Sequence, residues 1–299
     1  HIINHSESKL LFITDLIWEN IDAEQVPDLQ AVLSLNNMEL ILSRMSKSQA
    51  VDTMTIEDLF AEAYPNGFSK DNVKYIERSN AEVASINYTS GTTGFSKGVI
   101  TPANALAGNI LFGFKTGLVY PGCRHVAFLP LAHAYGCAFD FLACLAAGGH
   151  THLIGRTPSP KILMKAFAEV KPTLILSVPL ILEKIYKKMI QPQISRTAVS
   201  WVLKMPLLDK VVLNKIRETL VNAFGGAFSE IIIGGAPLNA EVEAFLKRLK
   251  FPLTVGYGMT ETAPLISFAH WDKFKSQSCG QVLDGLMEVR IASPDGDGV

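Results

Sequence analysis

The residues of this chain best suited to chemistry lie in one run, Tyr88–Gly98, which reads Tyr-Thr-Ser-Gly-Thr-Thr-Gly-Phe-Ser-Lys-Gly. Glycines let the backbone approach an anion closely and point N–H groups at it. The hydroxyls add hydrogen-bond donors, and the lysine adds a compact positive charge. The run therefore predicts a loop that holds the phosphates of a nucleotide.

The flanking sequence supports a phosphate loop over a flexible Ser/Gly linker. Residues 83–87 are mostly apolar and predict a strand, and residues 99–115 predict a helix, which gives a strand-loop-helix unit. The loop lacks the Walker A pattern, because Gly91 is followed at the matching positions by Ser96, Lys97 and Gly98. This disfavours a P-loop kinase, and no Rossmann G-x-G-x-x-G pattern occurs in the chain.

Two further blocks follow strand-like runs, Gly234-Gly235-Ala236-Pro237-Leu238 and Gly256-Tyr257-Gly258-Met259-Thr260-Glu261-Thr262. In their order and spacing, the three blocks resemble the signatures of the acyl-adenylate-forming (AMP-binding) superfamily of acyl-CoA synthetases, adenylation domains and luciferases. The usual loop is aromatic-Thr-Ser-Gly-Thr-Thr-Gly-x-Pro-Lys-Gly, so Ser96 stands where proline is commoner. The resemblance covers about residues 9–292.

This resemblance implies a two-step ligation. A carboxylate attacks the α-phosphate of ATP to give an acyl-adenylate and pyrophosphate, and a thiol, usually that of coenzyme A, then displaces AMP. ATP/AMP and Mg²⁺ would be the cofactors and coenzyme A a co-substrate. Such chemistry depends on positioning and charge neutralisation more than on a covalent protein group.

The resemblance also implies roles for particular residues. Thr260 would hydrogen-bond the α-phosphate, and Glu261 would hold Mg²⁺, a hard cation that prefers oxygen ligands. Glu261 could instead be a carboxylate that only stabilises a helix N-terminus. The residues implied to cradle the β- and γ-phosphates are Thr89, Ser90, Gly91, Thr92, Thr93, Gly94 and Lys97.

The adenine site would be lined by small residues, because a flat ring must approach the backbone closely. Gly235, Ala236 and Pro237 would form this wall, and Tyr257 would stack on the ring. Their alternatives are a simple turn at residues 234–235 and a core role for Tyr257. The nucleotide-binding residues of the last block also include Gly256 and Gly258.

Residues 131–136, Leu-Ala-His-Ala-Tyr-Gly, match the family's substrate-side block. His133 would be catalytic, beside the carboxylate to be activated, although a lone histidine is more often structural. Amino-acid-activating relatives usually place an aspartate here, whereas the nearest in this chain is Asp140. A substrate amine would lack a partner, which disfavours amino acids.

Several segments bear on the acyl group. Residues 206–217 and 258–264 resemble segments of long-chain fatty acyl-CoA synthetases and favour a long-chain fatty acid over other carboxylic acids. The small residues at 137–147 could floor an acyl tunnel or could be ordinary close packing. Activity as a long-chain acid–thiol ligase is thus the leading prediction. A carrier-protein loader and a non-catalytic nucleotide-binding module are the alternatives.

Composition limits the remaining classes. Lys and Arg number 27 against 28 Asp and Glu, which argues against a nucleic-acid partner. None of the four cysteines forms a C-x-x-C pair, which disfavours a zinc site, and Cys137 and Cys144 would share one helix face in the core. No signal peptide is evident, so a cytoplasmic location is predicted. Peripheral contact with the inner face of a membrane stays open, since three lysines (184, 187 and 188) form a basic helix face.

The alternation of strands and helices predicts an α/β fold, with layered parallel sheets and helices on both faces. Residues 1–267 would be a partial large N-terminal adenylation domain, and residues 268–299 the start of a small β-barrel, with an antiparallel element at 287–292. The ends look like cuts, so the family's first segment, its ribose-binding aspartate and its C-terminal domain would be absent and this fragment inactive alone. The predicted strands are 9–14, 124–129, 151–154, 173–177, 230–233 and 253–255, and the predicted helices 55–64, 134–147, 160–170, 191–227 and those starting at 179 and 240.

Overall fold

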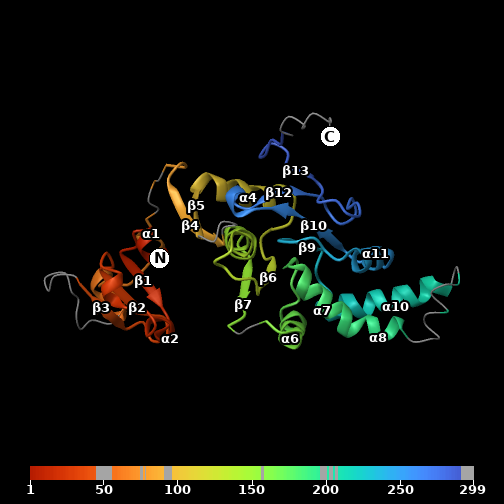
Figure 1. Cartoon of the computed structure of the whole chain (residues 1–299), viewed down its shortest axis with the longest axis horizontal. Helices are drawn as coiled ribbons and strands as arrows, with labels where there is room; N and C mark the ends of the chain where they lie inside the picture. The colour runs from red at the N-terminus through yellow and green to blue at the C-terminus, as the bar shows by residue number, and fades with distance from the viewer. Residues whose placement is uncertain are drawn as a thin grey trace. The chain divides into compact units, whose positions relative to one another are not determined.

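A computed structural model describes residues 1–44, 56–74, 77, 79–90, 96–155, 158–195, 201, 205 and 208–290. The chain divides into two compact units (Figure 1). The first comprises His1–Ser79 and Tyr88–Gly98, and the second comprises Asn80–Asn87 and Val99–Val299. The predicted domain boundary after residue 267 stays a prediction.

The first unit contains a three-stranded sheet in the order β1-β2-β3. β1 runs parallel to β2 with Leu10 opposite Ala31, and β3 is antiparallel to β2. A small core of Ile13, Val26, Leu29 and Val32 packs against it. The elements are α1 (Ile2–His5), β1 (Leu10–Ile13), α2 (Asp15–Trp18), η1 (Ala23–Gln25), β2 (Ala31–Ser34), β3 (Leu40–Ser43), α3 (Ile56–Ala63) and η2 (Lys70–Asn72).

A strand pair replaces the predicted strand-loop-helix unit. β4 (Val83–Ser90) pairs with β5 (Ser96–Pro102), and the helix α4 (Ala103–Lys115) begins only after β5. The prediction of a helix from residue 99 was therefore wrong at its start. Val99, Ile100 and Thr101 are β-branched, which favours a strand, and Pro102 is the N-cap of α4.

The second unit contains two parallel sheets, which confirms the predicted α/β class. β6 (Arg124–Ala127) pairs with β7 (His150–Leu153), with Arg124 opposite His150. The other sheet has the order β10-β9-β8, formed by Leu253–Val255, Ile231–Ile233 and Ile175–Ser177. All residues of β8, β9 and β10 are buried, as expected for parallel strands covered on both faces.

Helices surround these sheets (Figure 1): α7 packs against α6 and α8, and α6 packs against α10. Ser159 caps α6 by accepting a hydrogen bond from Ile162 N, and Asn239 caps α11 by accepting from Glu241 N and Val242 N. No helix among the described residues is long and apolar enough to cross a lipid bilayer. The helices are α6 (Pro160–Val170), α7 (Pro179–Met189), α8 (Gln191–Ile194), α10 (Leu208–Ala223) and α11 (Ala240–Arg248).

The helix predicted at residues 134–147 is mostly a π-helix, η3 (Gly136–Ala143), followed by the short α5 (Cys144–Ala146). A π-helix repeats at i→i+5, so the seven-residue spacing of Cys137 and Cys144 does not keep them on one face. Cys144 is buried, whereas Cys137 is half-buried. The predicted shared core face was wrong for this reason.

The chain then forms an antiparallel sheet in the order β11-β12-β13. These strands are Tyr257–Gly258, Leu265–Phe268 and Gln281–Val282, and η4 (Thr260–Thr262) lies in the turn between the first two. The strands described here do not close into a barrel. The antiparallel element therefore starts before residue 287, and residues 287–290 form no strand.

Candidate active site

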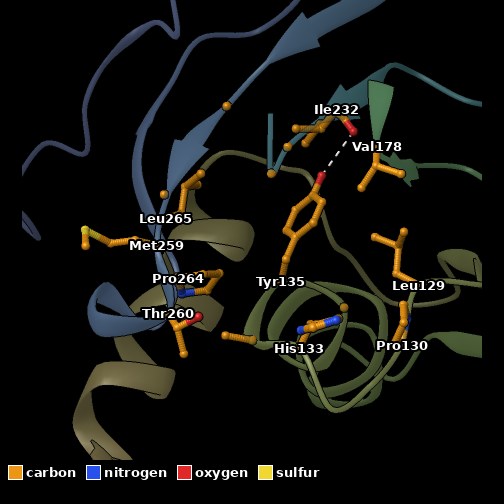
Figure 2. Close-up of a pocket in the computed structure, with 16 residues that line it drawn as sticks. Leu129, Pro130, His133, Tyr135, Val178, Ile232, Met259, Thr260, Pro264 and Leu265 are labelled. Atoms are coloured by element: carbon orange, nitrogen blue, oxygen red, sulfur yellow. Dashed lines mark hydrogen bonds between the residues drawn. The ribbon is translucent and has the colours of Figure 1, made fainter. Parts of the chain in front are cut away.

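A cavity of about 370 Å³ lies at the carboxyl ends of β6, β8, β9 and β10 (Figure 2). Parallel sheets place their ligands at this edge, and the volume lies in the range of roughly 300–1,000 Å³ typical of small-molecule sites. Its wall is mostly apolar, with His133, Tyr135 and Thr260 as polar side chains. The lining residues are Leu129, Pro130, His133, Ala134, Tyr135, Gly136, Val178, Ile232, Gly234, Gly235, Gly256, Gly258, Met259, Thr260, Pro264 and Leu265.

Tyr135 crosses the cavity from the start of η3 to the end of β9 (Figure 2). Its hydroxyl donates a hydrogen bond to the carbonyl oxygen of Ile232 at 3.0 Å. Burial raises the pKa of Tyr135 well above 10, and the nearby charge of Asp140 adds to this shift. A Cβ at Gly234 would come within 3.0 Å of the Tyr135 ring, so the glycine lets the ring lie against the backbone.

The Gly-Gly-Ala-Pro block forms the turn after β9. Gly235 has φ +85°, a left-handed conformation in which a side chain would be strained. Gly235 lines the cavity, whereas Ala236 and Pro237 are exposed and do not line it. Of the three residues predicted to form the adenine wall, only Gly235 therefore lines the cavity, and it does so with its backbone.

The block at residues 256–262 turns sharply between β11 and β12. A Cβ at Gly258 would collide with the carbonyl oxygen of Pro264, so only glycine fits there. Met259 N donates to the same carbonyl at 2.9 Å, and Thr262 Oγ1 donates to Met259 O at 2.9 Å. These bonds fix the turn that carries Thr260, which lies in the cavity wall (Figure 2).

The two other residues predicted in this block point elsewhere. Tyr257 is 52% exposed and Glu261 is exposed, and neither lines the cavity. Gly256 does line it, and a Cβ there would press on Leu265 Cδ1 at 3.2 Å. The exposure of Tyr257 contradicts the alternative that it is a core residue, and its predicted stacking on adenine stays a prediction.

His133 lies in the cavity wall on the segment between β6 and η3 (Figure 2). Its backbone N–H donates to Pro130 O at 3.0 Å, and its carbonyl accepts from Cys137 N at 3.0 Å. The side chain of Asn87 donates to Ala132 O at 2.9 Å. The backbone is thus fixed on both sides of an exposed imidazole, which suits a group that contacts substrate.

The predicted phosphate loop is described only in part. Thr89 and Ser90 end β4, Lys97 is exposed on β5, and all three belong to the first unit. The predicted phosphate-binding residues Gly91, Thr92, Thr93 and Gly94 lie outside the described residues. Their roles remain predictions from the motif.

Several lining residues have no motif of their own. Leu129 and Pro130 follow β6, Val178 follows β8, and Leu265 begins β12. For the first three, the position just beyond a parallel strand was the available signal. Among the described residues, no Asp or Glu side chain lines the cavity, and Asp140 is buried away from it.

A family model described as "AMP-binding enzyme" matches residues 1–299. The chain is 30% identical over 244 residues to a long-chain-fatty-acid–CoA ligase of Mycobacterium bovis, covering 73% of this chain and 39% of that protein. It is 32% identical over 211 residues to long-chain-fatty-acid–CoA ligase 4 of Saccharomyces cerevisiae, covering 64% and 30%. The chain therefore spans well under half the length of these curated relatives.

Solved structures show the same fold. Apo MatB from Rhodopseudomonas palustris superposes with a TM-score of 0.63 at 21% identity, covering 95% of this chain and 46% of that chain. A long-chain-fatty-acid–CoA ligase from Archaeoglobus fulgidus gives a TM-score of 0.60 at 20% identity, covering 95% and 49%. At these identities the likeness concerns the fold alone.

Proposed function

Because this chain belongs to the AMP-binding enzyme family, we propose that it serves the ATP-dependent activation of a carboxylic acid. The proposed acid is a long-chain fatty acid, and the proposed product of the whole protein is its coenzyme A thioester. One observation carries the proposal. His133, the turn at Gly234 and Gly235, and Thr260 come from separate blocks of the sequence and line one cavity.

We assign the groups as follows. The Thr260 hydroxyl donates to an oxygen of the α-phosphate, and His133 orients the attacking carboxylate on the other side. The adenine lies against the backbone of the turn at residues 234–237, where glycine permits close approach.

Mg²⁺ is part of the proposal. Glu261 follows Thr260 in the sequence and is exposed, so its carboxylate is accessible and is the kind of hard oxygen donor that Mg²⁺ prefers. The ion, when bound, would neutralise charge on the phosphates as they react.

The cavity supports an acid without an amine. Its described lining carries no carboxylate to pair with a substrate ammonium group, and burying such a charge unpaired is costly. The walls offer apolar contacts from Leu129, Val178 and Ile232 instead. This favours a fatty acid over an amino acid.

Calorimetric titration with non-hydrolysable acyl-adenylate analogues tests the proposal directly. Palmitoyl, acetyl and alanyl analogues should bind this chain in that order of affinity. Thr260→Val should weaken binding roughly ten- to hundredfold, as expected for a lost hydrogen bond to a charged group. Thr260→Ser should retain binding, and the exposed helix variant Thr219→Val is the matched control. Equal affinity of Thr260→Val and the unaltered chain would exclude this cavity as the adenylate site.

A second assay separates the acceptors. Incubation of the whole protein with MgATP, palmitate and coenzyme A, followed by mass spectrometry, should detect palmitoyl-CoA if the complete reaction is supported. Formation of the adenylate without the thioester would favour a carrier-protein loader. Nucleotide binding with neither adenylate nor thioester would favour a non-catalytic binding module. Peripheral membrane contact through the exposed Lys184, Lys187 and Lys188 stays a prediction, which sedimentation with anionic liposomes would test.

A further inference from the structure

A cluster of four polar side chains is enclosed in the second unit, separate from the cavity lining. Cys123 precedes β6, His125 lies on β6, Asp140 on η3 and Cys144 on α5. Each is at most 1% exposed. Cys123 Sγ lies 3.7 Å from Cys144 Sγ, and His125 Nδ1 lies 3.6 Å from Asp140 Oδ1.

The imidazole and the carboxylate of this cluster lack hydrogen-bond partners. In the part of the chain that the structure describes, the buried side-chain nitrogen and oxygen atoms without one are His125 Nδ1 and Nε2 and Asp140 Oδ1 and Oδ2. Buried polar atoms in folded proteins are nearly always satisfied, so four such atoms at one place need an explanation such as a bound ion.

We propose that Cys123, His125 and Cys144 bind a thiophilic metal ion, zinc(II) or copper(I), at a buried structural site. One ligand atom from each of the three lies within 4.8 Å of the others. Tetrahedral zinc with Zn–S bonds of about 2.3 Å sets two thiolate sulfurs roughly 3.8 Å apart, close to the separation of Cys123 and Cys144. Thiolate and imidazole donors select these soft or borderline ions over Mg²⁺ or Ca²⁺.

Asp140 acts as a positioning residue in this proposal. A histidine that binds a metal commonly donates its other ring N–H to a carboxylate, which fixes the tautomer and the ring orientation. Asp140 lies beside His125 Nδ1, which leaves Nε2 for the metal. The arrangement accounts for both ring nitrogens of His125 and for Asp140 Oδ1 without bringing Asp140 onto the ion.

The backbone holds the two thiols together. Gly149 N donates to Cys144 O at 2.8 Å, and His150 N donates to Cys123 O at 2.7 Å. A Cβ at Gly149 would lie 2.5 Å from Cys123 Sγ and 2.7 Å from Cys144 Sγ. Only glycine at this position leaves both sulfurs in place.

The 21-residue separation of Cys123 and Cys144 explains why the cluster has no motif in the sequence. The expectation against a zinc site depended on the absence of a C-x-x-C pair. Here the ligands come from a strand, its preceding residue and a helix end, which the fold alone brings together. The spacing of residues in the sequence therefore cannot indicate such a site.

Metal analysis of the chain purified without chelator tests the proposal. Elemental mass spectrometry should find zinc or copper at about one ion per chain, and Co²⁺ added to the metal-free chain should give thiolate-to-cobalt charge-transfer absorption. Cys123→Ser and Cys144→Ser should lower metal affinity at least tenfold. Cys137→Ser and Cys279→Ser remove cysteines outside the cluster and should leave it unchanged. Asp140→Asn should weaken it by roughly 10–100-fold.

A variant that keeps every ligand guards against misfolding of the cysteine variants. Gly149→Ala should abolish the cobalt spectrum by separating the sulfurs, whereas Gly155→Ala, where a Cβ meets nothing within 4 Å, should not. A metal-free chain that takes up neither cobalt nor copper(I), with four reduced thiols or with a Cys123–Cys144 disulfide, would overturn the proposal.

Discussion

Two regions adjoin the same strand, β6, and differ in whether their polar side chains are exposed or enclosed. Beyond the carboxyl end of β6, the segment that carries His133 and Tyr135 opens into the cavity, where Tyr135 bonds to Ile232 O. At the other end and within the strand, Cys123 and His125 are enclosed with Asp140. The cavity groups have backbone partners or exposure, whereas the enclosed imidazole and carboxylate have neither.

The cavity groups stay hydrated when no ligand is bound, whereas the enclosed cluster needs a partner inside the folded chain. An exposed hydroxyl or imidazole keeps its water until substrate displaces it, so an open cavity costs the fold little. Enclosed groups lose that hydration at once, and the loss must be offset by a charge partner or an ion. The comparison therefore predicts large effects on stability in the cluster and smaller ones in the cavity.

The largest effect is expected from breaking the enclosed pair. Asp140→Ala leaves His125 without the carboxylate that lies beside it and should lower the free energy of unfolding by about 3–5 kcal/mol. Urea denaturation followed by tryptophan fluorescence measures it. Asp209→Ala removes a carboxylate that pairs with Arg248 at the surface and should cost about 0–1 kcal/mol.

Replacing both members sharpens the distinction. If the cluster is only an ion pair, His125→Phe together with Asp140→Leu should restore most of the lost stability, because two apolar side chains replace two costly ones. If it holds a metal, the double variant should stay destabilised, since the ion is lost as well. Equal stability of Asp140→Ala and the unaltered chain would contradict both.

The next effect concerns the turn that holds Thr260. Gly258→Ala forces a Cβ onto the Pro264 carbonyl and should cost about 1–3 kcal/mol while moving Thr260. Gly108→Ala in α4 is the contrasting substitution, because its Cβ would make an ordinary contact with Leu286 at 3.5 Å. It should stabilise the chain by about 1 kcal/mol through helix propensity. Thermal unfolding of the two variants should therefore shift in opposite directions.

The same contrast explains what the sequence could predict. Strands β6 to β10 and the helix starts at residues 160 and 240 depend on local pattern, and all were predicted. His133, Gly235 and Thr260 line one cavity because parallel strands place the residues that follow them at one edge of the sheet. The strands and helix starts depend on residues that are close together in the chain, so the sequence alone is enough to predict them.

The remaining features depend on packing. The start of α4 was misplaced because β5 pairs with β4, and pairing overrode the helical pattern after residue 99. The π-helix η3 was read with an α-helical period, which misplaced Cys137. The assembly of Cys123, His125 and Cys144 needs the tertiary fold, so no local rule could find it.

At neutral pH, the smallest effect on stability is expected from Tyr135, which lines the cavity and also senses the charge of Asp140. Tyr135→Phe removes one hydrogen bond to Ile232 O and should cost about 1 kcal/mol. The folded-state pKa of Tyr135 lies well above 10, mainly through burial. The folded chain thus keeps this proton where the unfolded chain loses it.

The contribution of Tyr135 to stability is therefore complete below pH 10 and is lost as the pH rises toward the folded-state pKa, by about 1.4 kcal/mol per pH unit. Urea midpoints measured from pH 8 to about 11 should fall less steeply for Tyr135→Phe than for Tyr120→Phe, an exposed control. Because the charge of Asp140 also raises the pKa of Tyr135, Asp140→Asn should lower the folded-state pKa of Tyr135, so the loss still begins at the unfolded-state pKa but ends at a lower pH and is smaller in total. A total loss of unchanged size would mean that the charge of Asp140 does not act on Tyr135.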